Sequence, residues 1–121
     1  RMKLRLLVAT LALPVFAAPA LSQTTWVEVG DQVLVAPFNQ SADTVDDWDV
    51  YLADGNKIGE VEEVLGADAN AATALAIDFD GKHGFADRDV VVPLDQFTWT
   101  DNRLVLIADA SSVQAMETYN D

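Results

Sequence analysis

Apolar and polar residues alternate most regularly in the middle of the chain. Leu75, Ile77 and Phe79 occupy every second position, with small or acidic residues between them. This period predicts a strand with one buried face. Runs rich in β-branched and aromatic residues follow, separated by proline, aspartate and asparagine, and they predict further strands. These strands are expected at 89–92, 97–99 and 103–107.

The segment nearer the N-terminus contains two shorter apolar runs. Trp26–Val29 and Gln32–Val35 flank Gly30-Asp31, which predicts a hairpin whose type II′ turn begins at a glycine with positive φ. The polar stretch that follows holds Ser41 and Asp43, either of which suits the N-cap of a single helical turn.

A strand and a turn are expected next. The short β-type run Asp49–Leu52 is closed by Asp54–Asn56, whose residue types favour turns with positive φ.

Lys57–Leu65 is ambiguous. Its apolar residues recur at helical spacing, and Gly66 is suited to a helix C-cap. Gly59 favours the opposite interpretation, because an interior glycine weakens helices and often marks a bulge in a strand. The residues alone leave both a helix and a bulged strand open.

The last residues predict a short helix. Ser111 and Gln114 have the spacing of a capping box, and Val113, Met116 and Tyr119 would form one apolar stripe facing the strands. Short strands at regular intervals, followed by one helix, predict an all-β fold. We expect a small barrel, because closing the sheet removes its free edges.

The first residues have the pattern of a secretory signal peptide. A basic start at 1–5 is followed by the apolar core Leu6–Phe16 and small residues up to Ser22. Cleavage is expected after Ala20 or after Ser22; we favour the second, which leaves Gln23 first. The apolar stretch falls short of the roughly 20 residues that a membrane helix needs. We therefore expect a periplasmic or secreted protein, with no membrane insertion after cleavage.

The charge of the chain limits the classes of partner that it can bind, and its cysteine content limits how it can fold. All 20 acidic residues follow Ser22, against Lys57, Lys82, Arg88 and Arg103, so the remaining chain carries a net charge of −16. Such a surface repels nucleic acid and anionic lipid, keeps an exported protein soluble, and attracts cations or basic proteins. The chain has no cysteine, so it must fold without disulfides.

The chain lacks the residue types and motifs that the common catalytic arrangements need. Thiol catalysis and cysteine-ligated metals need cysteine, and His83 is the only histidine. No G-x-S-x-G sequence provides a serine nucleophile, and the glycines lack the spacing of a phosphate loop. We expect no enzyme, and we assign no catalytic, cofactor-binding or metal-binding residues.

One acidic loop is an alternative cation site. Asp78, Asp80, Asp87 and Asp89 flank the loop between two predicted strands, and carboxylates suit calcium. Their spacing does not match an EF-hand, so we favour a solvated turn. Weak calcium binding through the acidic surface is the second functional prediction.

Trp26, Phe38 and Trp48 lie in or beside the stretch that precedes the denser β pattern. Aromatic residues often anchor interfaces, but here we favour a simpler interpretation, in which they pack an N-terminal arm onto the barrel.

The order of these segments resembles the PRC-barrel family. Asp49–Leu65 is similar to its opening "V-Y-x-x-x-G-x-x-I-G-x-V-x-x-V" pattern, Ala74–Asp80 to the strand before its glycine-containing loop, and Asp89–Asp95 to its "V-x-V-P" strand. Arg103–Leu106 and the closing segment Ala108–Tyr119 continue the resemblance. It implies that Lys57–Leu65 is a strand bent at Gly59.

The resemblance also implies a function. Members of the family include a photosynthetic reaction-centre subunit and a ribosome-maturation factor, which use the barrel as an assembly surface and not as an active site. The expected signal peptide and the acidity of this chain mean that those particular roles do not transfer. We therefore expect a signal peptide at 1–22, an N-terminal extension at 23–47 and a PRC-type barrel at 48–120. The expected function is non-enzymatic binding of a protein partner.

Overall fold

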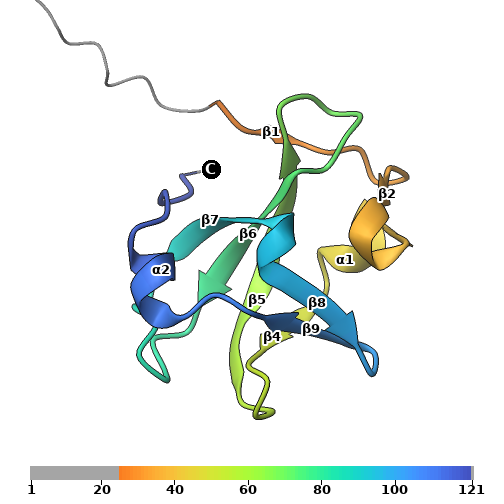
Figure 1. Cartoon of the computed structure of the whole chain (residues 1–121). Coiled ribbons are helices and arrows are strands. Elements are labelled where there is room, and N and C mark those ends of the chain that lie inside the picture. The colour runs from red at the N-terminus through yellow and green to blue at the C-terminus, as the bar shows by residue number, and fades with distance from the viewer. Residues whose placement is uncertain (1–24, 121) are drawn as a thin grey trace, which may run out of the picture.

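A computed structural model describes residues 25–120, and strands make up most of its regular structure (Figure 1). The predicted signal peptide and its cleavage sites lie outside the described residues. The strands are β1 (Val27–Glu28), β2 (Leu34–Val35), β3 (Gln40–Ser41), β4 (Asp49–Tyr51), β5 (Lys57–Gly66), β6 (Ala74–Phe79), β7 (Asp89–Pro93), β8 (Phe97–Thr100) and β9 (Arg103–Leu106). The helices are the 3-10 turns η2 (Ala36–Phe38) and η3 (Leu94–Gln96) and the short α-helices α1 (Ala42–Val45) and α2 (Ala110–Gln114).

The main sheet runs in the order β7-β6-β5-β4-β9-β8, with β1 added beside β5. The β4–β9 pair is parallel and the other pairs are antiparallel. β7 and β8 stand at opposite ends of this order, yet only the three residues of η3 join them. The sheet therefore curls back on itself into a half-barrel. The fold is the expected all-β fold of the small-barrel type with a short C-terminal helix.

The expected closure of the barrel is wrong in one respect. Within residues 25–120 the hydrogen-bonded order ends at β7 and β8, which do not pair with each other. The edge of β7 is covered in another way. The chain after α2 forms a bridge between Thr118 and Val90, and the Val91 N–H donates to the Glu117 carbonyl at 2.8 Å. A tail thus protects the edge that closure was expected to remove.

The ambiguous segment Lys57–Leu65 is a strand and not a helix, because it forms nearly all of the ten-residue β5. Its register shifts once against β4, opposite Val50 and Tyr51, and once against β6, between Val61 and Glu63. Gly59 itself pairs with Val50 and with Phe79. The predicted bend is therefore two irregularities that flank Gly59.

Close approach of two backbones explains why residue 59 is a glycine. A Cβ atom added to Gly59 would lie 2.5 Å from the carbonyl oxygen of Asp78 and 3.2 Å from the Cα atom of Phe79. Real Cβ atoms essentially never come so close to another atom. Gly59 lets the backbone of β6 lie closer to β5 at this point than a side chain would allow.

The core fills the inside of the curl and includes side chains from the stretch before Trp48. Ile58, Leu75, Ile77 and Phe79 are wholly buried there. The N-terminal stretch adds a further set of buried side chains to the same cluster: Val29, Val35, Phe38, Ala42 and Val45. The segment preceding β4 is thus part of the packed core.

A second, smaller cluster lies on the outer side of β5, β6 and β7. It consists of Leu65, Ala74, Ala76 and Val91, with Trp26 and Tyr119 packed against it. β6 is therefore buried on both faces along most of its length, whereas its alternation predicted burial of one face.

The two ends of the described chain meet over this cluster (Figure 1). The Trp26 indole donates to the Glu117 carboxylate at 3.2 Å, and the Tyr119 N–H donates to the Asp89 carbonyl at 2.9 Å. We call the segments around Trp26 and 117–119 the terminal clasp.

The expected hairpin of Trp26–Val29 with Gln32–Val35 is wrong. β1 pairs with the end of β5, and β2 pairs with β3. β4 is much shorter than β5 and leaves the last residues of β5 without a neighbour, which β1 supplies. A turn does lie here, closed by the Val33 N–H donating to the Gly30 carbonyl at 3.0 Å, but Gly30 does not have positive φ.

The short helices confirm one predicted cap and contradict another. Ser41 is the N-cap of α1 and accepts a hydrogen bond from the Thr44 N–H. α2 starts earlier than the expected capping box, because Asp109 is extended and its carboxylate accepts from the Ser112 N–H at 2.8 Å. The helix ends before Tyr119, which packs in the terminal clasp instead of extending the stripe of Val113.

No helix within residues 25–120 is both long and apolar enough to cross a membrane.

Candidate interaction surface

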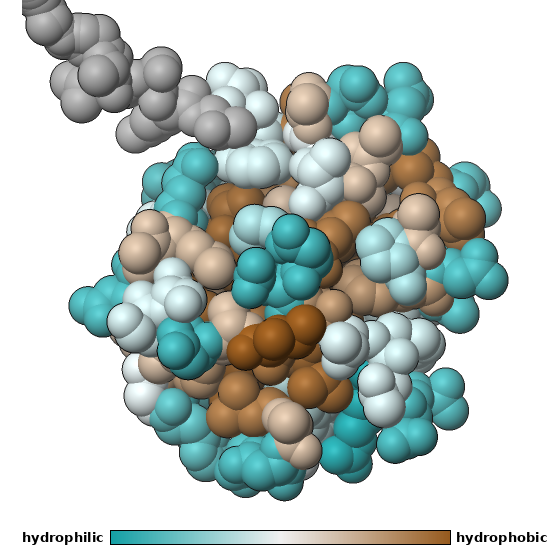
Figure 2. Space-filling model, in the orientation of Figure 1, coloured by the Kyte–Doolittle hydropathy of each residue, from teal (hydrophilic) through white to brown (hydrophobic). Residues whose placement is uncertain are grey.

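The outer side of β4, β9 and β8 differs from the outer side of β5–β7 because nothing in residues 25–120 forms an apolar cluster over it. The strand register places Tyr51 beside Val105, and Val105 beside Thr98. Beyond β9, alternation brings Ile107 to the same side, with 59% of its surface exposed. Figure 2 shows brown apolar surface in the lower middle of the molecule, surrounded by teal polar residues.

Arg103 stands between two hollows, one on this outer side of the sheet and one at the end where β4 and β9 begin. Its guanidinium carbon lies over the Tyr51 ring, 4.6 Å from the centroid. On one side is a depression of about 520 Å³ lined by Thr98, Thr100 and Val105 among others, which we call the outer groove. On the other side is a smaller hollow of about 290 Å³, which we call the notch.

The notch has an aromatic wall. Trp48, just before β4, stacks on Trp99 of β8 with 3.9 Å between the ring centroids and 6° between the ring planes. Phe38 lies behind them, 5.8 Å from Trp48. Because β4 and β9 run parallel and both begin here, the start of each strand lines the opening. Both tryptophans remain partly exposed.

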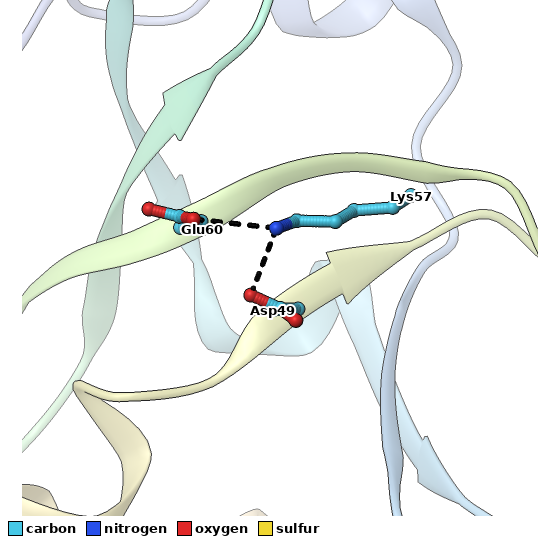
Figure 3. A network of polar contacts seen from close by, with 3 residues as sticks. All are labelled: Asp49, Lys57 and Glu60. Carbon is cyan, nitrogen blue, oxygen red and sulfur yellow. Dashed lines mark hydrogen bonds and ion pairs between the residues drawn. The ribbon is translucent and has the colours of Figure 1, made fainter.

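Two carboxylates, Asp47 and Asp49, complete the lining of the notch. Lys57 already binds one of them: its Nζ lies 3.2 Å from Asp49 Oδ1 and 3.2 Å from Glu60 Oε2 (Figure 3). Two hydrogen bonds raise the pKa of the Lys57 ammonium above its ordinary value. The bond to Asp49 has the larger effect and the bond to Glu60 the smaller. Asp47 is exposed and lies outside this network.

Carboxylates also gather beside the notch, around α1. Burial raises the pKa of Asp46 above its ordinary value, and repulsion from Asp47, Asp43 and Asp31 adds to the increase. Three other carboxylates, those of Asp47, Asp43 and Asp31, are therefore close enough to Asp46 to add to the negative charge beside the notch.

Most of the cationic side chains in the described residues already have partners. Arg88 donates to the Val113 and Gln114 carbonyls at the end of α2, at 3.2 and 3.0 Å, and to Thr118 Oγ1 at 2.6 Å. Arg103 is held on Tyr51. Lys82 is exposed in the loop after β6, away from the residues that line the notch.

The structure does not assemble the residues considered for metal or acid–base chemistry. His83 is exposed, with φ of 58° in a loop. Asp78 and Asp89 face each other across β6 and β7, while Asp80 and Asp87 are exposed. Within residues 25–120, no three His, Cys, Asp or Glu side chains are grouped as a metal would need.

The three singled-out aromatic residues have different roles. Phe38 is in the core and Trp26 is in the terminal clasp, whereas Trp48 lines the notch. The sequence interpretation missed Tyr51 and Arg103 as surface partners. Their positions on the outward phase of two predicted strands were a usable signal, but only the parallel pairing of β4 with β9 brings them together.

The fold and surface define a small β-barrel module in which the outer side of β4, β9 and β8 has no covering apolar layer among residues 25–120. A family model for the PRC-barrel domain matches residues 39–113, and the chain belongs to that family. PRC-barrel domains are generally non-catalytic modules. No curated protein matches the chain significantly.

Proposed function

We propose that this protein is a non-catalytic interaction module that acts in the periplasm or outside the cell. It binds a protein partner through the outer side of β4, β9 and β8, where the exposed Ile107 and the outer groove lie, and through the adjoining notch. The observation that carries the proposal is the unequal covering of the sheet. The terminal clasp covers the outer side of β5–β7, while the outer side of β4, β9 and β8 is left to solvent.

The residue types around the notch support binding of a protein. Tryptophan, tyrosine and arginine are the residue types most enriched at the energetic centres of interfaces. Trp99, Tyr51 and Arg103 all line the notch. Trp99 is held by stacking on Trp48, and Arg103 is held by its contact with the Tyr51 ring, before any partner arrives. Such preorganisation lowers the entropy cost of association.

The proposed location rests on the leader pattern at 1–22. The non-catalytic role rests on the family and on the shortage of catalytic groups. Weak calcium binding through the acidic surface stays a prediction. Calorimetry with calcium tests it, and the absence of both heat and a thermal shift would remove it.

Affinity capture from a periplasmic extract tests the proposed function, using Ile107→Glu as the disrupting variant. Leu34→Glu is the matched control, because Leu34 is similarly exposed, at 54%, but lies on β2 in the N-terminal arm. We expect Ile107→Glu to lose a partner that the unaltered chain and Leu34→Glu both retain. Equal capture by all three chains would refute the proposed surface.

A further inference from the structure

We infer that the notch receives a lysine or arginine side chain from an extended basic segment of the partner protein. This inference rests on the proposed function and names the chemistry of the partner at one part of the surface.

The walls of the notch suit a cationic side chain with an apolar stem. The partly exposed Trp48–Trp99 stack presents aromatic surface, against which the methylene groups of lysine or arginine pack and toward which their charge is attracted. Asp47 stands at the same opening and accepts hydrogen bonds from an ammonium or guanidinium group.

The charges around the notch favour a cation over an anion. Asp47 and Asp49 line it, and the crowded carboxylates near α1 repel one another. Lys57 neutralises part of Asp49 but does not reach Asp47. A cation supplied by a partner would relieve this repulsion, whereas a phosphate or a carboxylate would increase it.

Arg103 is the one cationic side chain in the lining, and its position limits its effect. It is drawn onto the Tyr51 ring at 4.6 Å, where it separates the notch from the outer groove. The incoming cation therefore meets Trp99 and Asp47, and the neighbouring backbone of the partner lies along the groove beyond Arg103.

The charge of the whole molecule acts in the same direction. The chain carries a net charge of −13, so a basic segment is steered toward it from any side. General attraction of this kind makes every acidic residue contribute similarly. A specific notch makes Asp47 contribute more than an acidic residue elsewhere, and this difference can be measured.

The test is binding of a short synthetic peptide that alternates lysine and threonine, with a glutamate–threonine peptide as the reverse-charge control. Asp47→Asn is compared with Asp80→Asn, since Asp80 is also exposed and its loss changes the net charge equally. Affinity is measured by calorimetry, and the indole N–H signals of Trp48 and Trp99 are followed by NMR.

We expect the lysine peptide to bind and to shift both indole signals, and the glutamate peptide to do neither. Asp47→Asn should weaken binding about fivefold to tenfold, as expected for a partly desolvated cation site. Asp80→Asn should weaken it by less than about twofold, as a distant screened charge would.

Equal weakening by the two substitutions, or no binding of the lysine peptide, would overturn the inference. The proposed function would survive either result if Ile107→Glu still abolished capture of the natural partner. Capture that is insensitive to Ile107→Glu would instead remove the proposed function.

Discussion

Replacing Gly59 with alanine tests the central geometric feature of the fold, the close approach of the paired strands β5 and β6 at Gly59. The added Cβ atom would meet the Asp78 carbonyl oxygen at 2.5 Å, where ordinary contacts begin at 3.4 Å. The two strands must therefore separate by about 1 Å, which is overpacking of the kind that costs roughly 1–3 kcal/mol. Gly59 pairs with Val50 of β4 on one side and with Phe79 of β6 on the other, so neither neighbouring strand can give way freely.

Alanine also has an intrinsic advantage over glycine in a strand, worth about 0.5–1 kcal/mol. We therefore expect Gly59→Ala to lower the free energy of unfolding by about 1–2 kcal/mol. For a domain of about 100 residues this corresponds to a fall in Tm of roughly 5–15 °C. Urea unfolding followed by tryptophan fluorescence measures the free energy, and an unchanged m-value shows that the two states are comparable.

Gly30→Ala is the matched control. Gly30 does not have positive φ, and the nearest atoms to its added Cβ would lie at 3.7 Å, an ordinary contact distance. This substitution should change stability by no more than about 0.5 kcal/mol. If Gly59→Ala were equally harmless, β5 and β6 would have room for a side chain at this position. The close approach of the two backbones would then not explain the glycine.

Three further predictions concern the terminal clasp and the carboxylates. Arg88→Ala should destabilise the chain by about 2 kcal/mol, because charged hydrogen bonds to the end of α2 are lost. Hydrogen exchange of the Val91 amide should also accelerate, and unchanged exchange would show that Arg88 does not hold the segment after α2 against β7. The Ser112 N–H lowers the pKa of Asp109, so this carboxylate stabilises the fold above its unfolded pKa of 3.8 and its contribution is lost as pH falls through the folded value. Asp109→Ala should therefore lower Tm more at neutral pH than in acid, and an equal loss at both pH values would contradict this. Asp46 has the opposite shift, so Asp46→Asn should raise Tm at neutral pH, an effect that disappears once the Asp46 carboxyl is protonated in acid; no stabilisation at neutral pH would refute it.

Elements that depend on local pattern could be predicted from the sequence. The alternation of Leu75, Ile77 and Phe79 identifies β6, because a strand turns every second side chain toward the core. The residues that follow Thr100 form a turn in which Asp101 and Asn102 both have positive φ, as their residue types favour. Both features arise from interactions between neighbours in the chain.

The misleading periodicity of Lys57–Leu65 has a tertiary cause. Ile58, Val61 and Val64 all face the core, although a regular strand places inward residues two apart. Each irregularity in β5 inserts one residue, so the inward residues fall three apart and imitate a helix. The spacing could not reveal this, because the bulges exist only where β5 meets β4 and β6.

The candidate surface was less predictable than the strands. Trp48 was singled out from the sequence, but its stacking on Trp99 and the contact of Arg103 with Tyr51 depend on strand order. Alternation shows which face a side chain occupies on its own strand. It does not show which strand lies beside it.

The sequence by itself determined where β6, β7, β8 and β9 form, how acidic the chain is and how few catalytic residues it holds, since each follows from residue type and near neighbours. Only the tertiary structure decided that β1 leaves its expected hairpin for the end of β5 and that Trp26 meets the tail near Tyr119. Those pairings follow from which sheet edges and apolar patches other segments leave uncovered, and that is a property of the whole folded chain.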